Sequence, residues 1–480
     1  AISPKMAADL HPRLFIMITM KFGGTSVGDI PRLQEVISII QSHLAKQPVV
    51  VASAMGGVTD TLLRTAQLAV QREIDQVENN VDALRERHLQ AASALVRNED
   101  RRKELIHSHS LLFDELLNLY SGVGLLRELS VRSLDAIASF GEILSCMQIA
   151  AILSDSGVPA QFVDARMLVR TDAHFGEAAV DFAVTNESIR NFLMPLVNAN
   201  VVPVVTGFIG STHDGLTTTL GRSGSDYTGS IIGAALGSEE IWIWTDVDGV
   251  MTADPRHVKG AMVLPQISYR EAAEMSYFGA KVIHPKTMLP AIENSIPIRI
   301  KNTFNPSHPG TLIARAANST ERVVKNVTSI DHLSLVAIEG NGMVGVPGIS
   351  ARIFSALARV HVNVMMISQA SSEHNVCVVI PQKDCRKAVQ ELQSEFEADI
   401  ARKIVDAIKV QDGVSIVAVV GEGMRGVPGI AGKTFSAVAQ AKVNVIAIAQ
   451  GSSELNISLV VEQLDARKAV QAIHDAFHLA

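Results

Sequence analysis

TTTLGRSGSDYTGSIIGAAL, residues 217–236, is the stretch on which the predicted fold depends. An extended run of threonines turns at 221–225 into a helix of small residues. A strand that ends at glycines and continues as a helix points backbone N–H groups and the positive end of the helix dipole outward, which favours an anion. Arg222 adds a guanidinium, and Ser225 and Asp226 add a hydroxyl and a carboxylate. The stretch predicts an anion-binding turn, although an ordinary connection with a capping Asp would show the same pattern.

Two strands nearer the amino terminus also end at glycine pairs. The apolar strand at 14–22 ends at Gly23-Gly24, and the one at 49–53 leads to Gly56-Gly57. A helical pattern follows each, and continuous apolar strands joined by helices are typical of a parallel sheet with both faces covered. Such sheets bind ligands beyond the carboxyl ends of their strands. We therefore expect these loops to share one crevice with the strand end at Thr245-Asp246.

The composition indicates a large aliphatic protein of about three structural units. Its 480 residues are 47% hydrophobic and 4% aromatic, with a formal net charge of -7 and no basic stripe, which argues against nucleic acid as the main partner. Cys146, Cys377 and Cys385 have no CxxC spacing, so neither a disulfide framework nor a metal held by the protein is expected. We find no secretion signal and no apolar run of about 20 residues, and expect a cytoplasmic protein without a membrane span.

Several further segments have clear local patterns. Residues 66–129 are helical and charged, which predicts solvated helices with His107 and His109 on the surface. The segment 201–220 predicts a hairpin that turns at Asp214-Gly215. A helix at 267–288 is interrupted near Gly279, with Lys281 just beyond.

The last third of the chain contains an internal duplication. GNGMVGVPGISARIFSALARVHVNVMMISQASSEHN returns as GEGMRGVPGIAGKTFSAVAQAKVNVIAIAQGSSELN at a constant offset, from Gly342 and Gly423 to Asn375 and Asn456. Each copy predicts a ferredoxin-like βαββαβ unit without its last strand. The segment 403–410 can complete the first unit. RVVKNVTSI at 322–330 is the free candidate for the second, so we expect the first unit to be inserted into the second.

Six ordered motifs resemble those of the aspartate kinases. They are KFGGTS at 21–26, SAMGGVTD at 53–60, SFGE at 139–142, TTLGRSGSDY at 218–227, WTDVDGVMTADPR at 244–256 and FGAKVIHP at 278–285. The tandem repeat is similar to the paired ACT domains of that family. The resemblance implies an α/β protein. Its amino acid kinase domain, at 14–315, would have an open, largely parallel sheet between helices. Two ferredoxin-like ACT domains would follow, the first at 333–411 and the second at 322–331 with 412–480.

The resemblance also implies an activity and its residues. Mg-ATP would phosphorylate the β-carboxylate of L-aspartate to 4-phospho-L-aspartate, the first step toward lysine, threonine and methionine; ATP and Mg2+ are the implied cofactors. Placed positive charge suits a reaction in which two anions meet. The implied catalytic residues are Lys21, Asp226 and Lys281. Arg222 would bind the α-carboxylate, and Glu142 and Asp226 would bind the amine or organise the lysines. Ser53, Thr59 and Ser225 would be hydroxyl donors. The implied nucleotide contacts are Lys21, Gly23, Gly24, Gly56, Gly57, Thr245, Asp246, Met251, Arg256 and Lys281, with Met251 where the family commonly has Tyr.

The ACT units imply feedback control by an amino acid. Candidate effector-binding residues are Asn363, Gln369, Asn444 and Gln450, although these would also recur simply because the fold repeats. A glutamine suits a hydroxyl or amide better than a second ammonium, which favours threonine over lysine as the effector. Paired ACT sheets imply a homodimer or homotetramer.

Three alternatives stay open. A glutamate or N-acetylglutamate kinase would share the fold, but such enzymes generally lack a tandem ACT tail. The chain would otherwise be the kinase portion of a bifunctional aspartokinase–homoserine dehydrogenase, whose dehydrogenase would lie outside the printed sequence. An amino-acid sensor with a dead kinase half is the third alternative, and the presence of Lys21, Lys281 and Arg222 argues against it.

Overall fold

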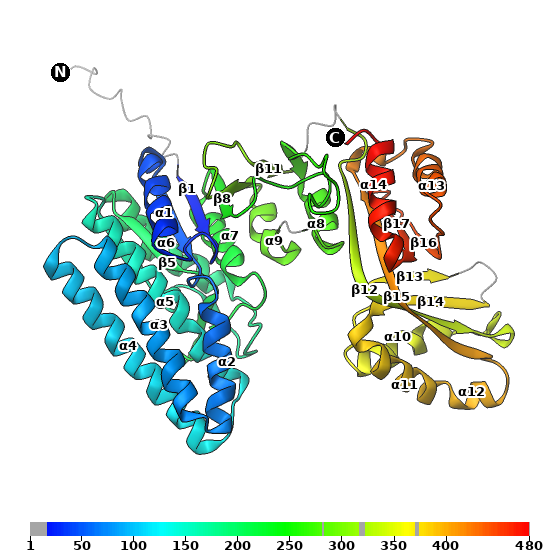
Figure 1. Ribbon diagram of the computed structural model, residues 1–480, viewed down its shortest axis with the longest axis horizontal. Helices are drawn as coiled ribbons and strands as arrows, with labels where there is room; N and C mark the ends of the chain where they lie inside the picture. Colours follow the sequence, from blue (N-terminus) through cyan, green and yellow to red (C-terminus); the bar gives the residue numbers. More distant parts are fainter. Residues whose placement is uncertain (1–16, 281–282, 316–321, 370–373, 480) are drawn as a thin grey trace, which may run out of the picture. The chain divides into compact units, whose positions relative to one another are not determined.

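The computed structural model describes residues 17–280, 283–315, 322–369 and 374–479 in two compact units. The first lies within Ala1–Gly249 and Ile283–Arg315, and the second within Val250–Val282 and Ala316–Ala480. Figure 1 traces the chain through both. The described part of the segment 250–282 is grouped with the carboxyl-terminal unit, although the sequence motifs place it within 14–315.

A mostly parallel sheet forms the centre of the first unit. Its strands there run in the order β3 (Ala160–Val163), β5 (Val202–Thr206), β2 (Pro48–Ala52), β1 (Ile18–Phe22), β8 (Glu240–Thr245), β10 (Ile298–Asn302) and β11 (Thr311–Ala314). Neighbours are parallel as far as β10, and β11 runs antiparallel to β10. Since β1, β2 and β5 are buried along their whole length, their sequences are predominantly apolar. The expected open, largely parallel sheet is confirmed.

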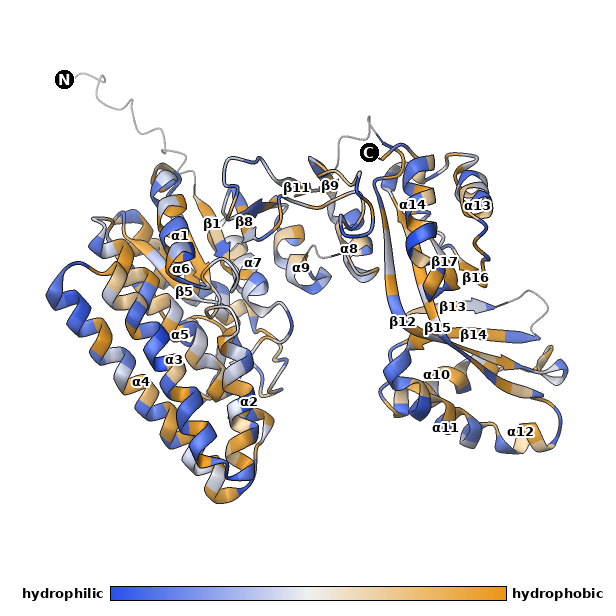
Figure 2. Ribbon diagram, in the orientation of Figure 1, coloured by the Kyte–Doolittle hydropathy of each residue, from blue (hydrophilic) through white to orange (hydrophobic). Residues whose placement is uncertain are grey.

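Helices cover both faces of this sheet. Alternate residues of β2 enter two hydrophobic clusters, because side chains along a strand point to opposite faces. Val50 and Ala52 belong to the cluster that includes residues of α1 (Ile30–Ser42), α2 (Val58–Gln71), α3 (Ile74–Leu95), α4 (Glu99–Leu126) and α5 (Val131–Asp155). Val49 and Val51 belong to the cluster with α6 (Phe182–Asn198) and α7 (Gly224–Leu236); α9 (Pro285–Glu293) follows later in the chain. Figure 2 shows the strands as predominantly apolar and α3 and α4 as mixed.

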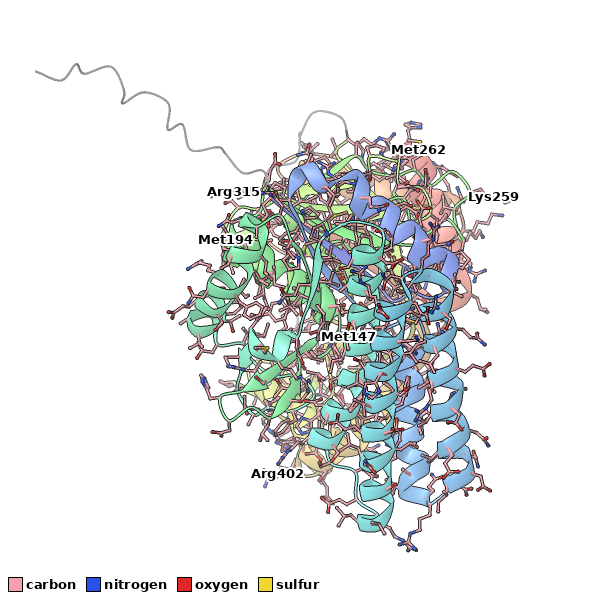
Figure 3. All side chains as sticks on the ribbon, turned by 90° about the vertical axis from the view of Figure 1, so that its left-hand side faces the viewer. Met147, Met194, Lys259, Met262, Arg315 and Arg402 are labelled. Carbon is pink, nitrogen blue, oxygen red and sulfur yellow. The ribbon has the colours of Figure 1, made fainter. Side chains whose placement is uncertain are left out.

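The α5 helix is the apolar centre of the helical layer. This helix is long and apolar enough to cross a membrane. However, 83% of its apolar 18-residue stretch is buried inside the protein, as in the core helix of a folded domain. Figure 3 views α3, α4 and α5 side by side, with Met147 of α5 labelled. His109 is fully buried, with its ring centroid 5.9 Å from that of His88. The expected surface position of His109 is therefore wrong, because α3 and α5 cover that side of α4, whereas His107 is exposed as expected.

A small second sheet leads to α7. It consists of β4 (Arg170–Thr171), β6 (Ile209–Thr212) and β7 (Thr217–Thr219). β6 and β7 form the expected hairpin, with Gly215 of the turn at φ +79°. Short 3-10 turns elsewhere span Leu44–Lys46, Ala165–Met167, Asn341–Met343, Gln382–Asp384, Glu422–Met424 and Gln463–Asp465.

An antiparallel sheet with helices forms the second unit. The strand order is β13 (Met366–Gln369), β14 (Asn375–Pro381), β12 (Asn326–Glu339), β15 (Ala407–Val420), β17 (Asn456–Glu462) and β16 (Ala447–Ala449). The first repeat contains α10 (Ile349–Arg359), α11 (Cys385–Glu395) and α12 (Glu397–Ala401), and the second contains α13 (Ile430–Gln440) and α14 (Ala466–Ala476). The segment before them supplies β9 (Gln266–Ser268) and α8 (Tyr269–Tyr277).

Two long strands each serve both repeats. The later part of β12, from Leu333 to Glu339, pairs with β15 beside the first repeat, and the register shifts after Ile330. The earlier part, from Asn326 to Ile330, pairs with Val420 to Ile416 beside the second repeat. The segment before the repeats therefore lies in the sheet of the second repeat, as insertion of one unit into the other requires.

A buried ion pair fixes α8 to the second repeat. Glu271, which is fully buried, accepts hydrogen bonds from Lys325 Nζ at 2.9 Å and from the Glu422 N–H at 2.8 Å. The same side chain closes a capping box with Ser268 at the start of α8. One carboxylate thus joins three separate segments of the second unit.

Candidate active site

A cleft of about 530 Å³ opens at the carboxyl ends of β1 and β2 and the first turn of α7. The sequence-predicted residues that line it are Lys21, Ser53, Thr59, Glu142, Arg222, Ser225 and Asp226. These come from motifs far apart in the chain, and parallel strands bring them together because their carboxyl ends meet at one edge. The cleft is also lined by residues that were not predicted, among them Asp60, Gly176 and Phe208.

Lys21 and Asp226 form the closest ion pair of the cleft. Lys21 is 7% exposed at the end of β1, and its Nζ lies 2.6 Å from Asp226 Oδ1. Asp226 is in the first turn of α7, but the N-cap residue of that helix is Ser223 and no side chain caps it. The alternative of a merely capping Asp is therefore wrong, because this carboxylate binds the lysine. A buried ammonium held in this way is available for an anionic ligand.

Glu142 is a buried acid at the floor of the cleft. It is 4% exposed, and its Oε1 accepts from the Ala54 N–H at 3.3 Å. Burial raises the pKa of Glu142 to about 8, against the smaller opposing effects of nearby N–H groups and of Lys21. The preceding glycine permits this approach, since a Cβ on Gly141 would lie 2.8 Å from Ala54 Cβ. Glu142 can therefore exist uncharged until a cation, such as a ligand ammonium, reaches it.

The turn before α7 presents Arg222 to the cleft. Gly221 and Ser223 have φ of +76° and +58°, so the backbone reverses tightly on both sides of the exposed arginine. The first turn of α7 follows directly, with Ser225 packed against Gly207, where an added Cβ would lie 2.6 Å from Ser225 Cβ. Guanidinium and free N–H groups at a helix start together favour a carboxylate.

The glycine pairs form a second part of the site. A Cβ on Gly24 would lie 2.9 Å from the Ala54 carbonyl oxygen, and one on Gly56 would lie 3.1 Å from that of Gly24. Arg87 of α3 donates to the Gly28 and Gly56 carbonyls and so ties the two loops together. Gly23, Gly24, Gly56 and Gly57 are not among the cleft-lining residues. The two glycine loops approach each other closely and carry no side chains there, so their backbone N–H groups could bind a phosphate group.

The other predicted nucleotide residues are distributed differently. Thr245 is the last residue of β8 and Asp246 follows it, beside β1, where the Gly23 N–H donates to the Trp244 carbonyl at 3.1 Å. Met251 and Arg256 belong to the second unit, where the Arg256 guanidinium pairs with Asp254 at 2.5 Å. Lys281 lies outside the described residues.

The candidate effector residues are exposed in the second unit. Asn363, Gln369, Asn444 and Gln450 flank the edge strands β13 and β16. These two edges approach each other, since Ser368 Oγ donates to the Ile448 carbonyl at 3.1 Å. The Ser371-Ser372-Glu373 segment beside Gln369 lies outside the described residues.

Comparison with known proteins agrees with this geometry. The amino acid kinase family model matches residues 17–302, and an ACT domain model matches residues 336–396 and 417–477. The chain is 38% identical over 472 residues to the chloroplastic bifunctional aspartokinase/homoserine dehydrogenase 1 of Arabidopsis thaliana, covering 96% of this chain and 51% of that protein. It is 34% identical over 477 residues to the chloroplastic aspartokinase 1 of Arabidopsis thaliana, covering 96% of this chain and 80% of that protein.

Solved structures show the same architecture. E. coli aspartokinase III in complex with aspartate and ADP (R-state) matches with a TM-score of 0.80 at 30% identity, covering 96% of this chain and 100% of that one. The same enzyme in complex with lysine and aspartate (T-state) matches with a TM-score of 0.77 at 30% identity, covering 96% of this chain and 99% of that one.

An amino acid kinase sheet with a cleft at its strand ends, followed by tandem ACT repeats, defines the class as an amino acid kinase family protein with ACT domains. The chain belongs to the aspartokinases of the amino acid kinase family. It spans about half the length of the bifunctional relatives that it matches.

Proposed function

We propose that this chain transfers the γ-phosphoryl group of ATP to the β-carboxylate of L-aspartate, giving 4-phospho-L-aspartate and ADP. The observation that carries the proposal is the joint placement of Lys21, Glu142 and Arg222 in one cleft. Aspartate has two carboxylates and one ammonium, and the cleft offers Lys21 and Arg222 as cations for the carboxylates and Glu142 as an acid for the ammonium. E. coli aspartokinase III has been solved with aspartate and ADP, which supports the same ligands here.

The charges of the site suit the chemistry. A carboxylate and a triphosphate repel each other, so the main task is to neutralise and align two anions. Lys21 at the end of β1 lies at the junction of the cleft and the glycine loops, and Asp226 holds its ammonium in place. Arg222 would bind the α-carboxylate and Glu142 the ammonium, while Ser53, Thr59 and Ser225 offer hydroxyl donors. The β-carboxylate is then left directed toward Lys21.

The nucleotide would be bound beside this cleft. The backbone around Gly24 and Gly56, which carries no side chains, fits phosphate groups, and Thr245 and Asp246 lie at the end of the neighbouring strand β8. Mg2+ would be held mainly by the phosphate oxygens, as is usual in kinase sites. Bound Mg2+ would neutralise charge on the transferring phosphoryl group. Roles for Met251, Arg256 and Lys281 remain proposals carried by the family motifs.

The test is ADP release with Mg-ATP and each candidate acceptor. We expect turnover with L-aspartate and none with L-glutamate or N-acetyl-L-glutamate. Lys21→Ala should abolish turnover, whereas Lys103→Ala, at an exposed lysine of α4 in the same unit, should preserve it. Saturable amino-acid binding without any turnover would instead indicate a sensor with an inactive kinase half.

We propose that the second unit binds a feedback amino acid at Asn363, Gln369, Asn444 and Gln450. The glutamines favour threonine, although the lysine complex of E. coli aspartokinase III makes lysine the direct competitor. Adding each amino acid to the ADP assay distinguishes them. We also propose that the chain assembles as a homodimer or homotetramer through its ACT domains and that it is cytoplasmic. The proposed domain limits are 14–315 for the kinase domain, 333–411 for the first ACT domain and 322–331 with 412–480 for the second. A joined homoserine dehydrogenase, as in the bifunctional relatives, would lie outside this chain.

A further inference from the structure

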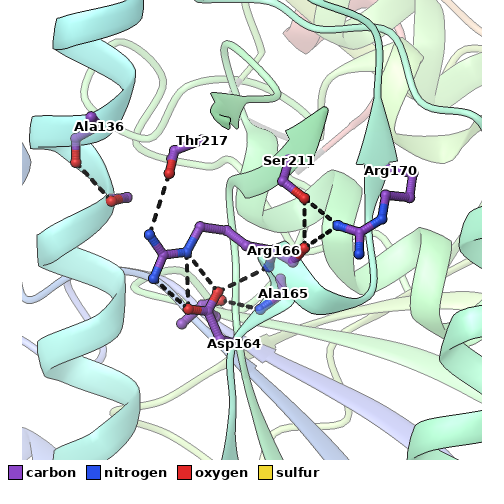
Figure 4. A network of polar contacts seen from close by, with 9 residues as sticks. Ala136, Asp164, Ala165, Arg166, Arg170, Ser211 and Thr217 are labelled. Atoms are coloured by element: carbon purple, nitrogen blue, oxygen red, sulfur yellow. Dashed lines mark hydrogen bonds and ion pairs between the residues drawn. The ribbon is translucent and has the colours of Figure 1, made fainter. Parts of the chain in front are cut away.

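The strand that leads to Arg222 is tied to its surroundings by each threonine of β7. Arg166 Nη1 donates to Thr217 Oγ1 at 3.3 Å, and Thr218 Oγ1 lies 2.7 Å from Thr171 Oγ1. Figure 4 shows the first of these contacts, with Arg166 held on its other side by Asp164. Thr219 Oγ1 donates to Asp135 Oδ1 at 2.7 Å. The last contact is the one nearest in sequence to the turn that carries Arg222.

Asp135 is a buried acceptor for three donors. It lies in α5 with 3% exposure, and besides the Thr219 hydroxyl it accepts the Thr219 N–H at 3.0 Å and the Gly176 N–H at 2.9 Å. Neither residue is close to it in sequence. A buried carboxylate that receives this many hydrogen bonds holds its donors firmly, because leaving any of them unpaired carries a desolvation penalty.

The two segments that Asp135 holds both border the cleft. Gly176 itself lines it, and the next residue, Glu177, packs against Gly221, where an added Cβ would lie 3.0 Å from Glu177 Cγ. The Ala178 N–H also donates to the Thr219 carbonyl at 2.9 Å. The wall from 176 to 178 and the turn from 219 to 221 therefore form one body fixed to α5.

The same helix carries Glu142. Seven residues separate the two acids, which is close to two helical turns and places them on the same face of α5. Glu142 and Arg222 would bind the ammonium and the α-carboxylate on the Cα atom of one small ligand, so the distance between them must be constant. In this protein α5 sets that distance, directly at Glu142 and through Asp135 at Arg222.

We propose that Asp135 is a positioning residue for the amino-acid side of the cleft: it fixes the Arg222 turn relative to Glu142 through Thr219 and Gly176. The inference rests on the proposed aspartate kinase function. Loss of Asp135 frees the turn and weakens binding of a ligand that bridges carboxylate and ammonium sites. The glycine loops are held by other contacts, including Arg87, so binding of the nucleotide stays unchanged.

The test compares Asp135→Ala with Asp135→Asn and with Asp155→Ala in the full chain. Asp155 is a matched control: it lies at the other end of α5 and accepts the Arg97 and Asn98 N–H groups at 2.8 and 2.9 Å. We expect Asp135→Ala to raise the KM for aspartate about tenfold, with the KM for ATP within about twofold of wild type. Asp135→Asn should recover most of this loss, because its amide oxygen can accept both N–H groups and its NH2 can donate to Thr219 Oγ1. Asp155→Ala should leave both KM values unchanged.

Hydrogen exchange gives a second readout that needs no catalysis. Amides in 172–180 and 216–224 should exchange faster in Asp135→Ala than in wild type and at the wild-type rate in Asp155→Ala. The inference is overturned if Asp135→Ala leaves the KM for aspartate unchanged, or raises the KM for aspartate and for ATP by the same factor. If Asp135→Ala does not fold, Thr219→Val, which removes only the hydroxyl, decides by the same comparison. Absence of turnover in the wild type would refute the kinase proposal while leaving the exchange test in place.

Discussion

Glu142 should make aspartate binding depend on pH. Burial raises the pKa of Glu142 to about 8, so the uncharged acid predominates at neutral pH. An ammonium group needs the carboxylate, and ionising Glu142 before binding costs about 1.4 kcal/mol for each pH unit below that pKa. We therefore expect the KM for aspartate to rise about tenfold per unit as the pH falls below about 8.

The assay is the KM for aspartate at saturating Mg-ATP from about pH 6 to about pH 9, for wild type and Glu142→Gln. The variant cannot ionise, so its KM should be high and independent of pH, with a difference from wild type that is largest above about pH 8. Titration of the nucleotide affects both proteins alike and cancels in the ratio. A pH indicator should also detect proton release when aspartate binds to wild type below about pH 8, and none with Glu142→Gln.

A constant KM for aspartate in wild type between about pH 6 and about pH 8, or a wild-type pH profile in Glu142→Gln, would refute this role of Glu142. Either result would mean that the ammonium is bound elsewhere. The effect of Lys21 on Glu142 gives a further check. Lys21→Met removes a nearby positive charge and should move the apparent pKa of Glu142 upward, which binding of an inert aspartate analogue can report.

Three further predictions concern packing and buried charge. Gly141→Ala places a Cβ 2.8 Å from Ala54 Cβ and should lower the free energy of unfolding by about 1–3 kcal/mol in urea titrations, whereas Gly122→Ala, with open space around it, should not destabilise. Burial lowers the pKa of His88 to about 4 and of His109 to about 3, so below about pH 6.5 only the unfolded chain binds protons at these two residues. As the pH falls below that value, the free energy of unfolding should decrease by about 1.4 kcal/mol per pH unit for each histidine, and His109→Phe should reduce that slope. Glu271→Ala leaves the Lys325 ammonium buried without its carboxylate and should cost about 3–5 kcal/mol in calorimetry, part of which Lys325→Met should restore.

The fold could be predicted where local pattern and topology agree. Continuous apolar strands ending at glycines indicated a parallel sheet, and β1, β2 and β8 do bring their carboxyl ends together. The repeat likewise indicated a strand exchange, since each copy lacked one strand; the early part of β15 completes the first repeat and the early part of β12 completes the second. The burial of His109 could not be predicted, because the pattern of α4 does not reveal that helices cover two of its sides.

The site could be predicted only in part, for a similar reason. Residues within motifs, such as Lys21 and Arg222, were found because glycines mark their turns. Phe208 and Gly176 line the same cleft but lie outside the six family motifs, and they reach it through tertiary contacts. The position of α8 in the second unit depends on Glu271, whose partners Lys325 and Glu422 are distant in sequence.

The exchange of strands between the repeats also determines the order in which the two halves of the second unit can fold during translation. The segment from Asn326 to Ile330 leaves the ribosome before the first repeat, but its partner, from Ile416 to Val420, leaves only after it. Until then this segment presents an unpaired edge that another chain could bind. The first repeat, by contrast, can close on the early part of β15 at once. A chain truncated between the repeats would therefore be prone to aggregate through this unpaired strand, and would not form a smaller version of the second unit.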